Sequence, residues 1–362
     1  MKALMFLAAL LLMLPAAVPA RAAEAAVWVF LYADRESQGS YTPANQTASR
    51  GHIQATVARH GTGGYTVNLA NAGAPGVTGV PVVTAVDDAG VHCQLASFYL
   101  ADDETTEVVE VACYAGTVPT DSRFTLSYFR STPPDSGASG AYGYVFDNQP
   151  AATTYSGAPG YNSAGGPLTI HHAAGTNIWT VRFAGRAFDN IGGNVQVSAV
   201  GIVPMRCSVY QWYPVSNPPG VDAQVRCDRL STPAYTPQWT LAYTHDRSIV
   251  GGTSGFFGYL QANQPGSAFY VPDPGRNRAA DPAYVHTVTR SNPGRYQAQV
   301  YGPLKEPMTA HVSVNGDTGN FCDIGSWSVT PSTQPAGRVD ITCYNAAGVP
   351  ADSWFSLNYF SP

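Results

Sequence analysis

The chain has 362 residues, more than one typical domain contains, and this length suits two or three domains. Charged residues make up only 12% of it, whereas glycine (36), proline (28) and tyrosine (21) are abundant, a composition typical of turn-rich β-structure. The formal net charge of −5 and the lack of a basic run give no reason to expect nucleic acid or an anionic membrane surface as a partner.

Residues 1–22 predict a secretory signal peptide. Lys2 precedes an apolar run that is too short for a membrane span, and small residues follow the run. The small-x-small pattern of residues 20–22 places cleavage after Ala22, with Ala20 as the alternative. No second apolar stretch approaches the ~18 residues of a span, so we expect a secreted or periplasmic protein whose mature chain has no membrane span.

One series of strands then recurs three times. Each copy has an opening strand, a turn followed by a strand that begins at an aromatic residue, a valine-rich run, two cysteine strands and a closing aromatic strand. The opening strands end at Asp34, Asn148 and Asn263, and the aromatic residues after the turn are Tyr65, Trp179 and Tyr296. The valine-rich runs are 82–86, 195–200 and 310–314, and the closing strands are 124–128, 239–243 and 355–359.

Each copy contains two cysteines, 20 or 21 residues apart. Six cysteines in an exported chain indicate three disulfides, and the repeat selects one of the 15 pairings that six cysteines allow. The predicted bridges are Cys93–Cys113, Cys207–Cys227 and Cys322–Cys343. Period-two alternation places Val109, Val111 and Cys113 on one face, so we expect the first bridge to point into a core.

The repeat predicts three antiparallel β-sandwich or jelly-roll modules of about 110 residues, with one disulfide each. Module 1 is 23–130, module 2 is 141–245 and module 3 is 255–362; the linkers are 131–140 and 246–254. Before two of the closing strands, Asp121 and Asp352 each follow a proline, which predicts a turn in which the aspartate binds its own backbone.

The whole motif resembles tandem repeats found in uncharacterised secreted bacterial β-sandwich proteins. The resemblance rests on the glycine-rich turn before Tyr65, the valine-rich runs, the cysteine pairs, an aromatic residue five positions after each first cysteine, and the closing strand. That aromatic residue is Phe98, Trp212 or Trp327. The strand pattern is also faintly similar to C1q-like jelly-roll domains. Such repeats imply a fold and no known chemistry.

Two sets of residues are candidates for function. Tyrosines that follow turns or neighbour Trp212 can stack on sugars, with core or turn packing as the alternative: Tyr41, Tyr155, Tyr270, Tyr210 and Tyr213. Carboxylates between the first two cysteines are hard ligands suited to Ca²⁺, with a solvated acidic loop as the alternative: Asp102, Asp103, Glu104 and Glu107. No other cofactor is predicted.

The residues that recur in all three copies are almost wholly cysteine, aromatic, valine and glycine, which are scaffold residues. No nucleophile motif is found, so no catalytic residue is predicted. We therefore expect a non-enzymatic, exported binding or surface protein that recognises a glycan or another cell-envelope ligand through its variable loops. The alternatives are a secreted hydrolase with a site between modules and a purely structural envelope component. The oligomeric state is left open.

Overall fold

The computed structural model describes residues 26–131, 140–188, 192–230, 236–249, 256–279, 281–316, 318–330 and 336–361. The predicted signal peptide lies outside these ranges, as do parts of both predicted linkers. The described residues confirm the all-β prediction, with two short 3-10 turns besides the strands: η1 (Arg186–Phe188) and η2 (Pro274–Arg276).

The strands fall into three series that follow the predicted modules. Module 1 contains β1 (Val27–Ala33), β2 (Ser40–Tyr41), β3 (Gln46–Ala48), β4 (Gln54–Gly61), β5 (Gly64–Ala70), β6 (Val80–Val86), β7 (Val91–Leu100), β8 (Glu107–Ala115), β9 (Val118–Pro119) and β10 (Arg123–Arg130). Module 2 contains β11 (Ala141–Phe146), β12 (Thr154–Ser156), β13 (Gly160–Asn162), β14 (Leu168–His172), β15 (Ile178–Ala184), β16 (Asn194–Val200), β17 (Met205–Ser216), β18 (Pro219–Arg229) and β19 (Gln238–His245). Module 3 contains β20 (Phe256–Ala262), β21 (Phe269–Tyr270), β22 (Asn277–Ala279), β23 (Thr287–Asn292), β24 (Arg295–Val300), β25 (Thr309–Asn315), β26 (Phe321–Val329), β27 (Gly337–Tyr344) and β28 (Trp354–Ser361).

Each module is a sandwich with one core between two layers of strands. In module 1, β1, β3, β6 and β10 form one layer, and β2, β4, β5, β7 and β8 form the other. The alternation in β5 buries Tyr65, Val67 and Leu69 against Phe124 and Leu126 of the opposite layer. The three predicted disulfides are confirmed, each joining residues that lie opposite one another on paired strands.

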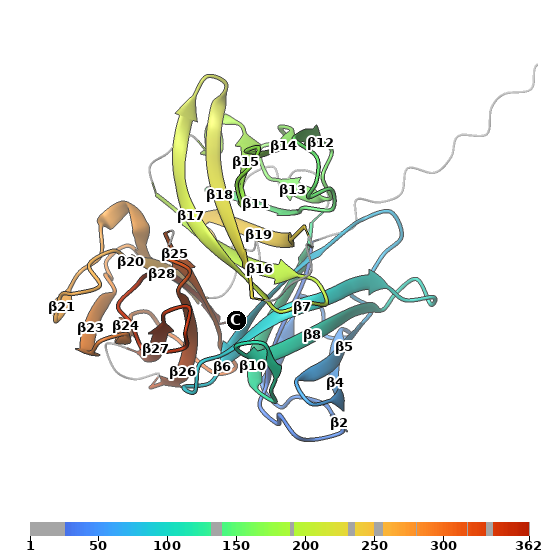
Figure 1. Ribbon diagram of the computed structural model, residues 1–362, viewed down its shortest axis with the longest axis horizontal. Helices are drawn as coiled ribbons and strands as arrows, with labels where there is room; N and C mark the ends of the chain where they lie inside the picture. The colour runs from blue at the N-terminus through green and yellow to red at the C-terminus, as the bar shows by residue number, and fades with distance from the viewer. Residues whose placement is uncertain are drawn as a thin grey trace, which may run out of the picture.

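The modules are arranged around a common centre, and every sheet is shared by two of them (Figure 1). The inner layer of module 1 continues through β6 into β26 of module 3. In the same way β16 of module 2 joins β7 of module 1, and β25 of module 3 joins β17 of module 2. The joins run from module 3 to 1, from 1 to 2 and from 2 to 3. The chain therefore closes into a ring with pseudo-threefold symmetry.

The strands that make these joins are buried on both faces, unlike an ordinary sandwich strand. All seven residues of β6, β16 and β25 are buried. In β6, Val83 packs into the core of module 1, whereas Thr84 on the other face contacts His311 of module 3. This double burial explains why the sequence here reads as a valine-rich run rather than a clean apolar-polar alternation.

A cycle of hydroxyl groups surrounds the centre. Ser198 Oγ accepts a hydrogen bond from the backbone N–H of Val83 in module 1 at 3.0 Å, and Ser313 Oγ accepts one from Val197 in module 2, also at 3.0 Å. Thr84 Oγ1 completes the cycle by accepting from Val312 N in module 3, at 3.4 Å. These hydroxyls occupy the same position in the three copies. A repeated polar residue thus satisfies buried backbone groups where neighbouring modules meet.

One position at the centre differs in every copy, namely Val82, Gln196 and His311. His311 is fully buried; its Nε2 lies 2.7 Å from Ser127 Oγ and its Nδ1 lies 3.2 Å from Thr84 Oγ1. Burial lowers the pKa of His311 to about 3, so the ring is neutral in the folded protein.

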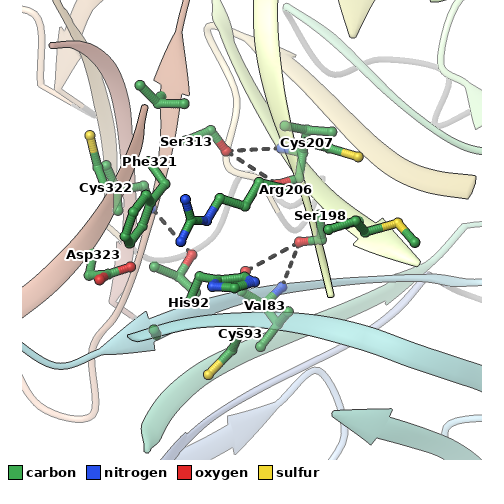
Figure 2. A pocket seen from close by; sticks show the side chains of 17 residues that line it. Val83, His92, Cys93, Ser198, Arg206, Cys207, Ser313, Phe321, Cys322 and Asp323 are labelled. Atoms are coloured by element: carbon green, nitrogen blue, oxygen red, sulfur yellow. Dashed lines mark hydrogen bonds between the residues drawn. The ribbon is translucent and has the colours of Figure 1, made fainter. Parts of the chain in front are cut away.

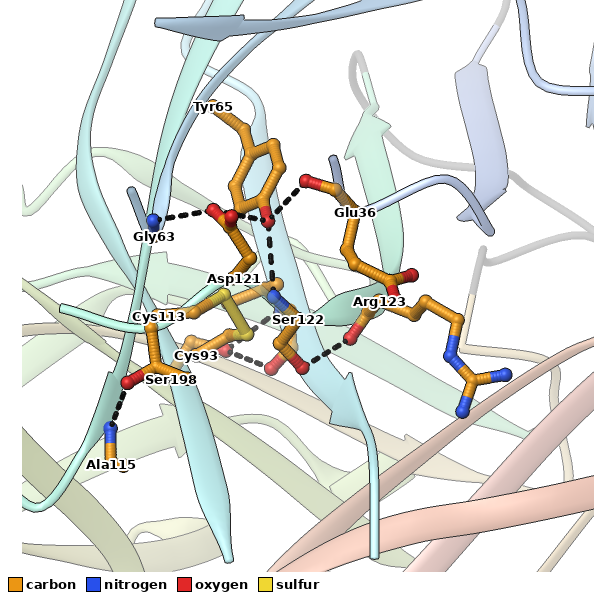
Figure 3. Close-up of a disulfide and its surroundings, with 12 residues drawn as sticks. Glu36, Gly63, Tyr65, Cys93, Cys113, Ala115, Asp121, Ser122, Arg123 and Ser198 are labelled. Atoms are coloured by element: carbon orange, nitrogen blue, oxygen red, sulfur yellow. Dashed lines mark hydrogen bonds between the residues drawn. A yellow bond between two sulfur atoms is a disulfide. The ribbon is translucent and has the colours of Figure 1, made fainter. Parts of the chain in front are cut away.

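A charged clamp fixes the outer hairpin of module 1, and Figure 3 shows how its Asp121 lies between Gly63 and Tyr65. Asp121 accepts two hydrogen bonds from Arg59, at 2.9 and 2.8 Å, and one from the N–H of Gly63, at 2.8 Å. Tyr65 donates its hydroxyl to the carbonyl of Glu36 and accepts from the N–H of Ser122. The prediction that Asp121 binds its own backbone is therefore wrong, because its carboxylate instead holds the β4–β5 hairpin on the far side of the sandwich.

Module 3 repeats this clamp with Arg290, Gly294, Tyr296 and Asp352, so the same correction applies to Asp352. Gly63 has a φ of +69°, and a Cβ there would lie 2.5 Å from the carbonyl oxygen of Cys113, which is why the turn requires glycine. Module 2 has no aspartate at this position. Its Trp179 instead stacks on His172, with ring centroids 4.4 Å apart.

Asp121→Ala and Asp352→Ala should each lower the free energy of unfolding by about 1 kcal/mol, because each removes a bidentate ion pair that solvent partly screens. Arg59 and Arg290 hold the pKa of these two carboxyls below the ordinary value. The stabilisation is therefore present above the ordinary aspartate pKa and is lost as the pH falls through the lowered value. Thr236→Ala, at the exposed equivalent position of module 2, is the control and should change stability by less than about 0.5 kcal/mol. Equal losses in all three variants, measured by urea unfolding, would contradict the clamp.

His311→Gln places the residue of module 2 at the same position in module 3. The folded-state pKa of His311 is lowered, so its unfolded form takes up a proton between pH 7 and pH 5 while the folded form does not. The wild type should lose about 2 kcal/mol over this range through His311, and the variant should lose about 2 kcal/mol less. Urea unfolding at the two pH values measures the difference, and an identical pH dependence would show that His311 is not buried as a neutral ring.

Candidate functional site

Two of the tyrosines predicted to contact a ligand are core residues. Tyr41 is 8% exposed and Tyr270 is 6% exposed, and each packs in the core of its own module. The prediction that these two rings could stack on a sugar is wrong, because Tyr41 on β2 and Tyr270 on β21 point into the core while the residue before each is exposed. Tyr155 is half-buried and donates its hydroxyl to Asp147 at 2.7 Å. The alternative prediction, that Tyr41 and Tyr270 pack in the core, is confirmed.

Tyr213 is the predicted tyrosine that presents a ring to solvent. It is 37% exposed on β17, whereas its neighbour Trp212 is buried and donates its indole N–H to the carbonyl of Gly192 at 2.8 Å. Tyr210 is half-buried beside a β-bulge, where the register shifts between Val209 and Gln211. The bulge sets which residues of the distal half of β17 face the core and which face outward.

Tyr99 occupies the position in module 1 that Tyr213 occupies in module 2, and it is 51% exposed. A bulge between Leu95 and Ser97 gives β7 the same change of register as β17. Sequence reasoning missed Tyr99. The sequence did contain a signal for it, because Tyr99 and Tyr213 each lie six residues after the first cysteine of their module. Module 3 has Ser328 at that position.

Tyr99 borders a cleft of about 260 Å³ between modules 1 and 2. Most of the lining is apolar: Ala74, Gly76, Val77, Phe98, Tyr99, Leu100, Phe146 and Pro159, together with Thr78 and Glu107. The rings of Phe98 and Phe146 meet edge to face, with centroids 4.8 Å apart, and so join the two modules beneath the cleft. The cleft is therefore mostly apolar, with an exposed tyrosine at its edge.

Glu107 lies at this cleft but is only 6% exposed, and Tyr128 donates its hydroxyl to Glu107 Oε2 at 3.3 Å. Burial raises the pKa of Glu107 to about 7. Asp103 has the opposite environment, because it accepts hydrogen bonds from Thr105 N, Thr106 N and Thr106 Oγ1 in an exposed turn. The hydroxyl of Thr106 is the main cause that lowers the pKa of Asp103 to about 2.

The four predicted calcium ligands do not gather into one site. Asp102, Asp103 and Glu104 are exposed in the turn, whereas Glu107 points under Tyr128. Within the described ranges, no three His, Cys, Asp or Glu side chains are placed to hold a metal ion. The alternative prediction, a solvated acidic loop, is confirmed for Asp102–Glu104.

The outward hairpin of module 2 has different polar neighbours. Tyr213 lies opposite Asp222 on β18, and Asp222 forms a bidentate ion pair with Arg182 of β15. The hairpins β7–β8 and β17–β18 project from the centre in different directions (Figure 1). The two exposed tyrosines therefore mark two separate faces, one with a buried carboxyl and the other with an ion pair.

Comparison with protein-family models, with curated proteins and with solved structures gives no match. None of the described residues belongs to a helix with the length and apolar character that crossing a membrane requires.

Glu107→Gln should raise the free energy of unfolding at pH 8 by about 2 kcal/mol and change it little at pH 5. The folded-state pKa is raised, so the contribution of Glu107 is fully favourable below its ordinary pKa and is lost as the pH rises towards 7. The amide keeps an acceptor for Tyr128 without a charge. Glu104→Gln in the exposed turn is the control and should change neither value by more than about 0.5 kcal/mol. A wild-type stability that does not decline from pH 5 to pH 8 relative to the Gln variant would contradict the raised pKa.

Proposed function

We propose that this chain is an exported, non-enzymatic binding protein that recognises carbohydrate on a polysaccharide or cell envelope through its outward hairpins. The observation that carries the proposal is the pair of exposed tyrosines at equivalent positions, Tyr99 at 51% and Tyr213 at 37% exposure. A planar ring held on a rigid hairpin loses little entropy when it stacks on a ligand. The cleft beside Tyr99 adds apolar surface.

Export is part of the same proposal. It is supported by the predicted signal peptide and by the three disulfides, since such bonds persist in oxidising compartments.

Two hairpins that point in different directions favour an extended ligand or a surface over a small molecule. Each face offers a limited area, so a single contact would be weak. Two contacts on one rigid ring raise the total affinity without new interactions, provided that the ligand reaches both. A hydrolase that uses Asp103 and Glu107 is less well supported, because Asp103 is committed to its turn and Glu107 is buried.

The experiment measures retention of the full chain by insoluble polysaccharides and by purified cell-wall sacculi. Tyr99→Ala and Tyr213→Ala should each weaken binding about tenfold, equivalent to the loss of one aromatic contact of ~1.4 kcal/mol, and the double variant should lose retention. Phe269→Ala, which removes a 61% exposed aromatic outside these hairpins, is the matched control and should bind like the wild type.

Three results would count against the proposal: no retention on any glycan, equal loss in the Phe269 control, or turnover of a polysaccharide by the wild type. Melting temperatures within about 2 °C of the wild type would show that the variants are folded.

A further inference from the structure

A small cavity of about 60 Å³ lies at the centre of the ring, where all three modules contribute residues (Figure 2). The residue before the first cysteine of each pair lines it. This residue is His92 in module 1, Arg206 in module 2 and Phe321 in module 3, so the scaffold brings three different side chains to equivalent places. The repeated hydroxyls beside them are already committed to backbone groups of the neighbouring modules.

Arg206 is a buried cation with unused hydrogen-bonding capacity. It is 8% exposed, and its guanidinium carbon lies 3.6 Å from the centre of the Phe321 ring. Nη1 donates to the carbonyl of Ala346 at 3.3 Å, whereas Nε has no partner. A guanidinium withdrawn from water is costly unless an acceptor or a negative charge faces it.

His92 supplies a second unpartnered group in the same cavity. It is 6% exposed, neither ring nitrogen makes a well-aligned hydrogen bond although the backbone of Tyr114 lies beside the ring, and the ring meets Phe321 edge to face at 6.0 Å. Burial and then Arg206 lower the pKa of His92 to about 3, so its ring is neutral and has one N–H to donate.

Asp323 does not supply the missing negative charge. In the other modules its position holds Gln94 and Ser208, which bond to backbone carbonyls of the next module. Asp323 is 2% exposed, and its Oδ2 has no hydrogen-bond partner. Asp323 and Arg206 both belong to the part of the chain that the structure describes, and they form no ion pair within 4.0 Å. Burial and the charge of Asp87 raise the pKa of Asp323 well above its ordinary value, although Arg206 opposes the shift. Arg206 is thus a buried cation with which no carboxylate of the described residues forms an ion pair.

We propose that this central cavity is a binding site for one small monovalent anion, between chloride and acetate in size, held by Arg206 Nε and the N–H of His92. A cavity of about 60 Å³ is large enough for such an ion. The ion would neutralise a cation at the point where the modules meet. Its binding would therefore stabilise closure of the ring, independently of any glycan on the outer hairpins.

The test compares thermal unfolding of the full chain in sodium bromide, sodium acetate and sodium gluconate at equal ionic strength, gluconate being too large for the cavity. Nonspecific salt effects act alike on wild type and variants. The midpoint should rise in bromide and in acetate, relative to gluconate, by about 3 °C more for the wild type than for Arg206→Met. Methionine keeps the contact with Phe321 and removes the charge. Arg206→Gln is a second variant should the first not fold.

Asp323→Asn is the matched control, because it removes the neighbouring carboxyl and leaves the proposed donors. It should keep the anion-dependent rise. The proposal is overturned if the wild type and both Arg206 variants respond alike, or if the anion effect is lost in Asp323→Asn. A third outcome would also overturn the proposal. If the unfolding midpoint differs between sodium chloride and calcium chloride, and this difference disappears in Asp323→Asn, the cavity binds a cation.

Discussion

The structure depends on how three strands, β6, β16 and β25, are partnered on both edges. Each pairs with the closing strand of its own module, and its other edge would present unpaired N–H and C=O groups if the module stood alone. A strand from a neighbouring module pairs with the last residue of each, namely Val86, Val200 or Asn315. Further along each strand, a hydroxyl of another module accepts a backbone N–H. Because the third join returns to the first module, these contacts close the ring. Sheet closure, burial of both strand faces and the pseudo-threefold arrangement are consequences of this pairing.

Within that ring, repeated and unrepeated positions have different roles. The hydroxyls of Thr84, Ser198 and Ser313 satisfy backbone groups at every join, so the scaffold requires them in each copy. The positions of His92, Arg206 and Phe321 beside them carry no such requirement, and their side chains need only fit the central cavity. Three copies of one chain would have to place the same side chain there three times, whereas a fused chain can place a histidine, an arginine and a phenylalanine. The fusion therefore permits an asymmetric polar cavity at the centre of a symmetric scaffold.

The outer faces follow the same division. Bulges in β7, β17 and β26 recur, and they turn Phe98, Trp212 and Trp327 towards the cores. The next residue then points outward, where Tyr99 and Tyr213 are free to differ from Ser328. The clamp of Asp121 and Asp352 shows a structural role for a charged residue that two copies need and the third replaces with an aromatic stack.

The main strands, the all-β class, the three modules and the disulfide pairing followed from the amino-acid sequence alone, because period-two burial, turn chemistry and a repeated spacing are local properties of the chain. The sequence also led to Tyr213. The three-dimensional structure was needed to show that Tyr41 and Tyr270 are buried and that Asp121 bonds to a distant hairpin. It was also needed to show that His92, Arg206 and Asp323 line one cavity. The three cavity residues lie more than 100 positions apart in the sequence, and they come together only because strands of different modules pair with one another. The valine-rich runs and the repeated hydroxyls of Thr84, Ser198 and Ser313 mark the strands that join modules, but they do not say which strand of another module each one meets.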